Sequence, residues 1–170
     1  EDDALALFEV TEELTADAGL AAYEVSNHAR TGHECRHNLI YWNYGEYAGV
    51  GPGAHSRIRG AGGEPFAIEM VRMPEEWRRQ VLETGTGAGI RTAVAPADAA
   101  NEYMLMGLRL SGGIDLQRYE RLAGAPPDSE RIATLHEEGL ADSKAPPGRL
   151  AVTPRGRRVL NAVVRYLAGG

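Results

Sequence analysis

Apolar residues near the amino terminus recur at three- and four-residue steps, and they include Ala4, Leu7, Phe8, Leu14 and Ala18. This spacing predicts an amphipathic helix from Asp3 to Ala18, with Gly19 as its C-terminal stop. The run Leu20–Val25 is short, apolar and compatible with a β-strand. Helix, loop and strand form half of a βα repeat, and such a strand needs parallel neighbours. We therefore expect the carboxyl-terminal part of a larger α/β protein.

An aromatic-rich block follows a polar stretch and the cysteine at position 35. Asn38 is expected to cap a short helix there. Tyr47–Val50 is predicted to be a second buried strand that runs directly into a glycine-rich turn. Together with Leu20–Val25, this strand is expected to form a neighbouring parallel pair that brings the glycine turn and His37 to one common edge.

The next segment has the pattern of a hairpin and a helix. Arg57–Arg59 and Phe66–Val71 are predicted to pair as antiparallel strands. Pro74 is suited to the first position of a helix, because it fixes the backbone angle and lacks a donor that would be unpaired there. The glycine run 85–89 and the mixed segment after it predict a linker, with a domain boundary near residue 90.

The carboxyl-terminal half is patterned as helices with one hairpin. Pro96–Leu110 is predicted to be a helix, and Asp115 and Asp128 are predicted to cap two more. Leu140–Asp142 and Arg149–Val152 are predicted to pair as a hairpin around a Pro/Gly loop. Thr153-Pro154 is predicted to begin a last helix. Three helices, a hairpin and a helix are typical of a winged-helix arrangement.

Charge is unevenly distributed along the chain. Residues 1–29 hold eight acidic residues and no Lys or Arg, whereas residues 145–170 hold five Arg and no acidic residue. Such runs usually form a solvated face. The net charge is −6, and the helix of the winged-helix pattern that would lie in a DNA groove, Asp128–Glu138, carries four acidic residues against one Arg. Both features argue against a nucleic-acid partner.

One cysteine, Cys35, excludes an internal disulfide and any multi-cysteine metal site within this chain. No apolar run approaches the ~18 residues of a membrane span, and the amino terminus does not look like a secretory signal. A reducing, cytoplasmic location is therefore expected.

Two motifs can carry chemistry, and each has a structural alternative. The glycines around Gly51 and Gly53 follow an apolar run, where they suit either a tight turn or the close approach of a ligand. His37 lies beside Asn38, Tyr41 and Trp42, so its imidazole could ligate a metal centre next to flat aromatic rings or could simply pack in the core. Cys35 is either a rival thiolate ligand or a small buried side chain.

Together, four blocks in this order resemble the HemW family of radical S-adenosylmethionine (SAM) proteins, haem chaperones long described as oxygen-independent coproporphyrinogen III oxidases. The blocks are YEVSN at 23–27, CRHNLIYW at 35–42, GVGPGAHS at 49–56 and MLMGLRL at 104–110, with GID at 113–115 after the last. The resemblance covers essentially the whole chain. It implies that residues 1–60 are the last repeats of a partial (β/α) barrel, 61–95 a hairpin, helix and linker, and 96–170 the family's carboxyl-terminal domain with a winged-helix-like end.

The resemblance also implies ligands. It implies haem binding by the H-N-x-x-Y-W block, which corresponds here to His37, Asn38, Tyr41 and Trp42, with His37 as the candidate iron ligand. It implies a SAM-binding edge near the glycine loop, for which the candidates are Ser26, Gly51, Gly53, Ala54 and His55. Haem-chaperone activity implies transfer of haem to an acceptor protein, and a homodimer is possible.

The family holds its [4Fe–4S] cluster with a C-x-x-x-C-x-x-C motif, and this chain has no such motif. Three thiolates are needed to leave one iron open for SAM, so the cluster and SAM chemistry are expected only in a full-length protein. Whether this chain is itself an enzyme is left open. The first functional hypothesis is haem binding and transfer, and the alternatives are coproporphyrinogen III oxidation and a non-enzymatic docking module. An incomplete barrel is also expected to be weakly stable or to self-associate.

Overall fold

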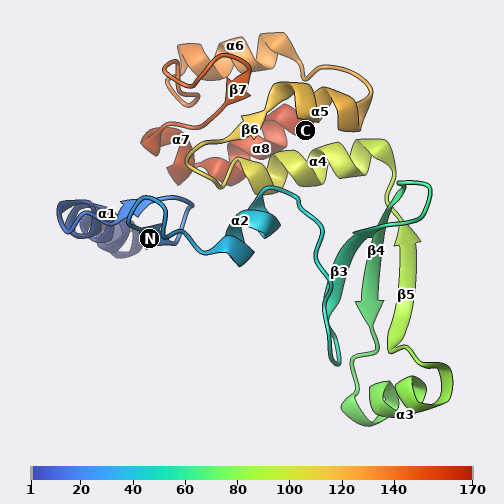
Figure 1. The fold of residues 1–170 in the computed structure, drawn as a ribbon. Coiled ribbons are helices and arrows are strands. Elements are labelled where there is room, and N and C mark those ends of the chain that lie inside the picture. Colours follow the sequence, from blue (N-terminus) through green and yellow to red (C-terminus); the bar gives the residue numbers. More distant parts are fainter. Residues whose placement is uncertain (1, 170) are drawn as a thin grey trace.

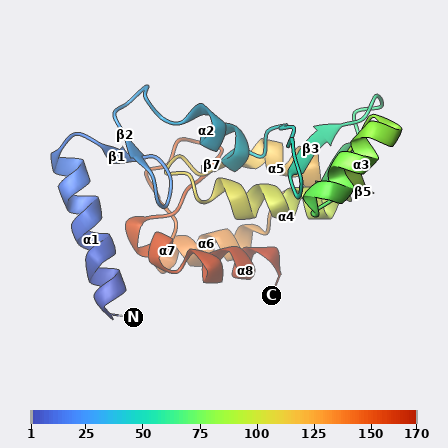
Figure 2. The same ribbon diagram turned by 90° about the horizontal axis from the view of Figure 1, so that it is seen from below.

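The structure is a computed structural model that describes residues 2–169, with side chains described from residue 5 onward. Figures 1 and 2 place α1 and the β1–β2 hairpin at one end of the molecule and the β3–β4–β5 sheet with α3 at the other. The elements in chain order are α1 (Asp2–Asp17), β1 (Ala21–Ala22), β2 (His28–Ala29), α2 (Arg36–Trp42), β3 (His55–Arg59), β4 (Pro65–Met70), α3 (Pro74–Thr84), β5 (Ala88–Ala93), α4 (Pro96–Gly107), β6 (Ile114–Asp115), α5 (Leu116–Ala123), α6 (Ser129–Glu137), β7 (Arg149–Leu150), α7 (Pro154–Arg158) and α8 (Leu160–Ala168).

The hydrophobic core lies in the carboxyl-terminal half. Its largest fully buried apolar side chains are Met104, Leu108, Ile114 and Leu150, which come from α4, the residue after it, β6 and β7. The inner face of α8 closes this core. By contrast, most of α1 and β5 is exposed. The segments before residue 96 lie largely outside this core, and α2 is one that contacts the carboxyl-terminal body directly, through α4.

Two helix caps predicted from the sequence, those at Asp115 and Asp128, are confirmed. Asp115 accepts a hydrogen bond from the Arg118 amide at 2.8 Å, and Asp128 accepts from two amides at the start of α6. Pro74 is the first residue of α3, and Thr153 caps α7. The last helix differs from its prediction, because it is divided at Val159 into α7 and α8.

The hairpin prediction is also confirmed: β3 and β4 pair antiparallel, and β5 adds a third strand beside β4. The linker predicted at 85–95 is therefore wrong. A Cβ at Gly87 would lie 2.0 Å from the Trp77 indole nitrogen, and the Gly87 carbonyl accepts from the Val71 amide at 2.9 Å. Glycine here permits close packing of backbone against α3, and the boundary expected near residue 90 falls inside a strand.

The predicted pair of parallel strands is wrong. Only Ala21–Ala22 of the first run is a strand, and it pairs antiparallel with β2. Tyr47 makes an isolated antiparallel bridge with Arg57, and Val50 is 88% exposed, so Tyr47–Val50 is no buried strand. These apolar runs are too short to specify a partner by pattern, and Ala21–Ala22 and Tyr47 pair with segments within ten positions after them. Placement of residues 1–60 in a barrel stays a prediction.

Two smaller predictions also need correction. Cys35, not Asn38, occupies the N-cap of α2, and Asn38 lies within the helix. The hairpin expected between Leu140–Asp142 and Arg149–Val152 is reduced to one bridge, Ala141 with Val152, because Arg149–Leu150 pairs with β6 instead. The winged-helix reading of this half stays a prediction.

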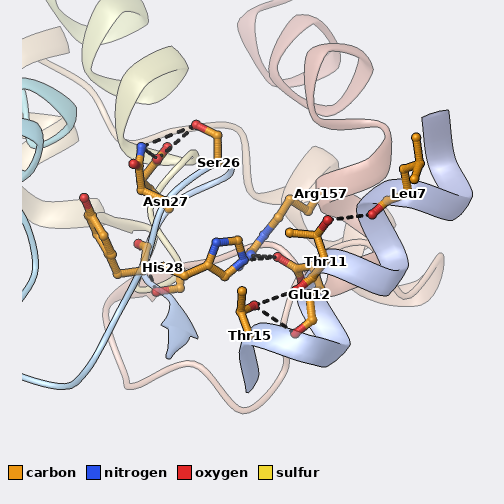
Figure 3. Close-up of polar contacts among 11 residues, drawn as sticks. Leu7, Thr11, Glu12, Thr15, Ser26, Asn27, His28 and Arg157 are labelled. Atoms are coloured by element: carbon orange, nitrogen blue, oxygen red, sulfur yellow. Dashed lines mark hydrogen bonds and ion pairs between the residues drawn. The ribbon is translucent and has the colours of Figure 1, made fainter. Parts of the chain in front are cut away.

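The acidic start and the basic end of the chain meet in space. In Figure 3 the Glu12 carboxylate of α1 lies between His28 and Arg157, with its Oε1 3.6 Å from a nitrogen of each. Arg158 pairs with Glu9 at 2.7 Å. Part of the charge predicted to form a solvated face is therefore paired, and α1 is held against α7.

Candidate functional site

The aromatic block forms α2, and the helix sorts its residues onto two faces. Residues four apart lie on the same side of a helix. His37 and Tyr41 form one such pair, and both are exposed. Asn38 and Trp42 form the other, and both are half-buried. The four residues of the motif therefore separate into an outward pair and an inward pair.

The inward pair fixes α2 to the body of the protein. The Asn38 amide donates to the Tyr23 hydroxyl at 3.2 Å, which ties α2 to the segment after β1. The Arg109 guanidinium lies over the Trp42 ring at 5.4 Å from its centroid, a cation–π contact with the end of the α4 region. Asn38 and Trp42 thus position the helix, and the side chains of His37 and Tyr41 remain exposed on its outward face.

The turn after α2 is held by an arginine from α5. Arg118 donates to the Asn43 carbonyl at 2.7 Å and to the Tyr44 carbonyl at 2.9 Å. Tyr44 has a φ of 53°, a conformation that is uncommon outside glycine and therefore needs such support. Burial and the neighbouring Glu102 carboxylate raise the pKa of Tyr44, so its phenol stays neutral. This turn sends the chain from α2 toward the sheet.

The outward pair opens into a depression of about 530 Å³ between α2 and the start of the sheet. We call it the His37 depression. The Tyr41 ring lies 5.5 Å from the Tyr47 ring and 4.9 Å from the Trp42 ring. The residues that line the depression are His37, Tyr41, Tyr47, Ala48, Gly49, His55 and Arg57. It thus combines two imidazoles, two phenol rings and one guanidinium.

An ion pair with Glu102 holds Arg57 in the wall of the His37 depression. Arg57 makes two contacts with Glu102 of α4, at 2.9 and 3.1 Å. Burial is the largest influence on the Glu102 carboxyl and opposes its ionisation, but hydrogen bonding by Arg57, the nearby Tyr44 hydroxyl and the Arg57 charge together outweigh burial and lower the pKa. Burial also raises the pKa of Tyr47, so its hydroxyl stays protonated. Arg57 therefore keeps a fixed positive charge at the edge of an aromatic surface.

The glycine-rich loop reaches the same depression at one end. The Gly49 amide donates to the Ser56 hydroxyl at 3.0 Å, and Ser56 is 3% exposed. A Cβ at Gly49 would lie 2.2 Å from the His55 carbonyl oxygen, so only glycine fits there. Gly51 and Gly53 have positive φ angles and turn the chain back into β3.

Some candidates from the sequence are brought together and others are not. His37, Tyr41 and His55 share the depression, whereas Gly51, Gly53 and Ala54 form the turn beyond its lining. Ser26 is elsewhere: its hydroxyl donates to the buried Glu24 carboxylate at 3.1 Å, near α1 (Figure 3). The expected grouping of Ser26 with the glycine loop is not formed. Cys35 is exposed and does not line the depression.

Sequence reasoning missed three residues of this region, namely Tyr47, Arg57 and Glu102. Tyr47 was assigned to a buried strand, and Arg57 and Glu102 lie 45 positions apart, so no local pattern links them. The aromatic and histidine content of the surrounding blocks was the available signal, and it led to His37 and His55 but not to these three residues.

The chain is similar in sequence to known proteins. Residues 94–159 match the family model of the HemN C-terminal domain. The heme chaperone HemW of Mycobacterium tuberculosis is 37% identical over 171 residues, which are 99% of this chain and 40% of that protein. The heme chaperone HemW of Haemophilus influenzae is 31% identical over 125 residues, which are 73% of this chain and 31% of that protein. The chain belongs to the HemW family.

A solved structure supports the fold. The structure matches that of the radical SAM enzyme coproporphyrinogen III oxidase (HemN) from Escherichia coli with a TM-score of 0.68 over 97% of this chain and 41% of that chain, at 17% identity. The chain therefore has the mixed α/β fold of the matching part of HemN. It spans about 40% of the length of the HemW relative from Mycobacterium tuberculosis and of HemN. No helix within residues 2–169 is long and apolar enough to cross a membrane.

The iron–sulfur cluster of radical SAM enzymes does not fit the residues of this HemW-family chain. A SAM-binding [4Fe–4S] cluster needs three thiolates, and the sequence supplies one, Cys35. The Cys35 side chain is exposed at the start of α2 and is not part of the depression. No chemical step is therefore assigned to a cluster in this chain.

Proposed function

We propose that this chain binds haem in the His37 depression, with the His37 imidazole as an iron ligand. The observation that carries the proposal is the separation of the aromatic block into two faces. Helix α2 buries Asn38 and Trp42 in fixed contacts and presents His37 and Tyr41 to an open depression. A residue kept only for packing would be expected on the inward face.

The chemistry of the lining suits a porphyrin. Aromatic rings favour stacked or edge contacts with a flat apolar ligand, and Tyr41 and Tyr47 supply two of them. A neutral imidazole is a common ligand of haem iron. The volume of about 530 Å³ lies within the ~300–1,000 Å³ usual for small-molecule sites. The Arg57 guanidinium, held by its pair with Glu102, adds a polar edge to this aromatic lining.

A carrier role follows from the openness of this site. Its histidine and tyrosine are exposed, so bound haem would remain reachable by a second protein. Two relatives are named heme chaperones. We propose that the chain carries haem for transfer to an acceptor protein, and that SAM and a [4Fe–4S] cluster belong to a full-length protein. The glycine turn at Gly51, Gly53 and Ala54 stays the candidate SAM edge.

Haem titration of the chain tests the proposal. We expect a saturable shift of the Soret band in the native protein, which is strongly weakened in His37→Ala and unchanged in Cys35→Ala. His33→Ala is the matched control, because His33 is an exposed histidine four residues earlier that does not line the depression. Equal loss in His33→Ala and His37→Ala, or a loss confined to Cys35→Ala, would reject the ligand assignment.

A further inference from the structure

The His37 depression contains a second imidazole, and it comes from a different part of the chain. His37 belongs to α2, whereas His55 is the first residue of β3. Both side chains are exposed and both line the depression. By contrast, His28 lies in the cluster with Glu12 and is 14% exposed. A single ligand bound in the depression could therefore contact the imidazoles of both His37 and His55.

The backbone around His55 is fixed on three sides. In the sheet His55 is paired with Glu69, and the next residue, Ser56, is buried and accepts from the Gly49 amide at 3.0 Å. The Met70 amide donates to the carbonyl of Ala54 at 2.8 Å. The backbone of His55 is thus held in a hydrogen-bonded strand. The backbone of His37 lies in a helix whose inward face is held by Asn38 and Trp42.

A porphyrin supplies four nitrogen ligands to its iron, so the protein can supply one or two more. Two imidazoles that reach the iron from different elements produce a six-coordinate centre, whereas one produces a five-coordinate centre. We infer that His55 is the second axial ligand of haem bound at His37. This inference rests on the proposed haem binding, and it places His55 with haem instead of with the SAM edge.

Absorption and electron paramagnetic resonance spectra of the haem-loaded chain test this inference. We expect the native ferric complex to be six-coordinate and low-spin. His55→Ala should still bind haem but become high-spin, with affinity lowered by about tenfold or more, since tenfold corresponds to only ~1.4 kcal/mol. Added imidazole should restore the low-spin spectrum of His55→Ala by filling the open position. His33→Ala should leave spin state and affinity unchanged.

The outcomes separate this inference from the proposed function. A native complex that binds haem through His37 but is high-spin, or whose low-spin spectrum survives in His55→Ala, contradicts the role of His55 and leaves the haem site standing. A low-spin spectrum that is lost in Cys35→Ala and kept in His55→Ala identifies a thiolate ligand and overturns the inference. Absence of haem binding by the native chain rejects both.

Discussion

Arg57 and Glu102 join the sheet to the helical body through two hydrogen-bonded contacts, Nη2 to Oε1 at 2.9 Å and Nε to Oε2 at 3.1 Å. The two side chains are 26% and 31% exposed, so a partly buried ion pair connects the wall of the His37 depression to α4. Orientation of Arg57 toward a ligand depends on it. Several properties of the protein should follow from this pair and its neighbours.

Replacement of Glu102 by Gln should lower the free energy of unfolding by about 1 kcal/mol at neutral pH. This is below the ~1.5–3 kcal/mol of hydrogen bonds to charged groups, because both partners keep some contact with water. The pKa of Glu102 is lowered from an ordinary value of 4.5 in the folded protein. Its stabilising effect is therefore complete above the unfolded pKa and is lost as the pH falls from about 5 through the folded pKa. Urea unfolding at several pH values measures this slope.

The matched control for this variant is Glu83→Gln. Glu83 pairs with Arg79 at the same distance of 2.9 Å, but the two side chains are 56% and 61% exposed. Its removal should change stability by less than about 0.5 kcal/mol. Equal effects of Glu83→Gln and Glu102→Gln, or a Glu102→Gln variant with an undiminished acid slope, would show that the Arg57 pair does not anchor the sheet.

Ala at position 49 should destabilise the protein by about 2 kcal/mol, because the new Cβ would lie 2.2 Å from the His55 carbonyl and backbone must move. The same shift would displace His55 and weaken its contact with haem. Gly62→Ala is the control, since its Cβ would meet only the movable end of Glu64 at 2.7 Å. Thermal melts of both variants compare the two positions, and a Gly49→Ala melt that matches Gly62→Ala would refute the close packing.

The two faces of α2 should respond differently to mutation. Trp42→Ala should cost about 2 kcal/mol of stability, less than the ~3–5 for a fully buried Trp, because the ring is half-exposed and stacked under Arg109. His37→Ala should change stability by less than about 0.5 kcal/mol, because its side chain is exposed. Denaturant unfolding measures both. Comparable losses in the two variants would mean that His37 is a packing residue.

The features predicted correctly were those fixed by neighbouring residues. The caps at Asp115 and Asp128 depend on contacts within three positions, and both form as expected. The β3–β4 hairpin is likewise local. The sequence also led to His37 and His55, because their blocks are unusual in composition.

The features predicted wrongly depend on contacts that composition alone does not specify. Tyr47–Val50 has the composition of a buried strand, yet its one bridge is to Arg57 and it forms an edge of the depression. Glycines 87 and 89 have the composition of a linker, yet they let β5 pack against α3 and β4. A glycine that allows close approach and one that allows flexibility look identical in sequence.

Arg157 should be more important for stability than its neighbour Arg155. The Arg157 side chain is 11% exposed and lies 3.6 Å from Glu12, which also faces His28 (Figure 3). Arg157→Gln should cost about 1–2 kcal/mol, because it leaves a partly buried carboxylate without its cation. Arg155→Gln removes an equally basic but exposed side chain and should cost less than about 1 kcal/mol. Urea midpoints that rank the variants in the opposite order would contradict the pairing of the two chain ends.

Placement of haem in the His37 depression is tested most directly by nuclear magnetic resonance with zinc protoporphyrin, a diamagnetic analogue of haem. The isotope-labelled chain should show amide shifts in residues 36–42, 47–49 and 55–57, and these shifts should be strongly reduced in His37→Ala. The alternative surface is an apolar hollow between α6 and α8, lined by Leu135, Leu140, Val163 and Tyr166 among others. Shifts confined to that hollow, with His37 and His55 unmoved, would contradict the account.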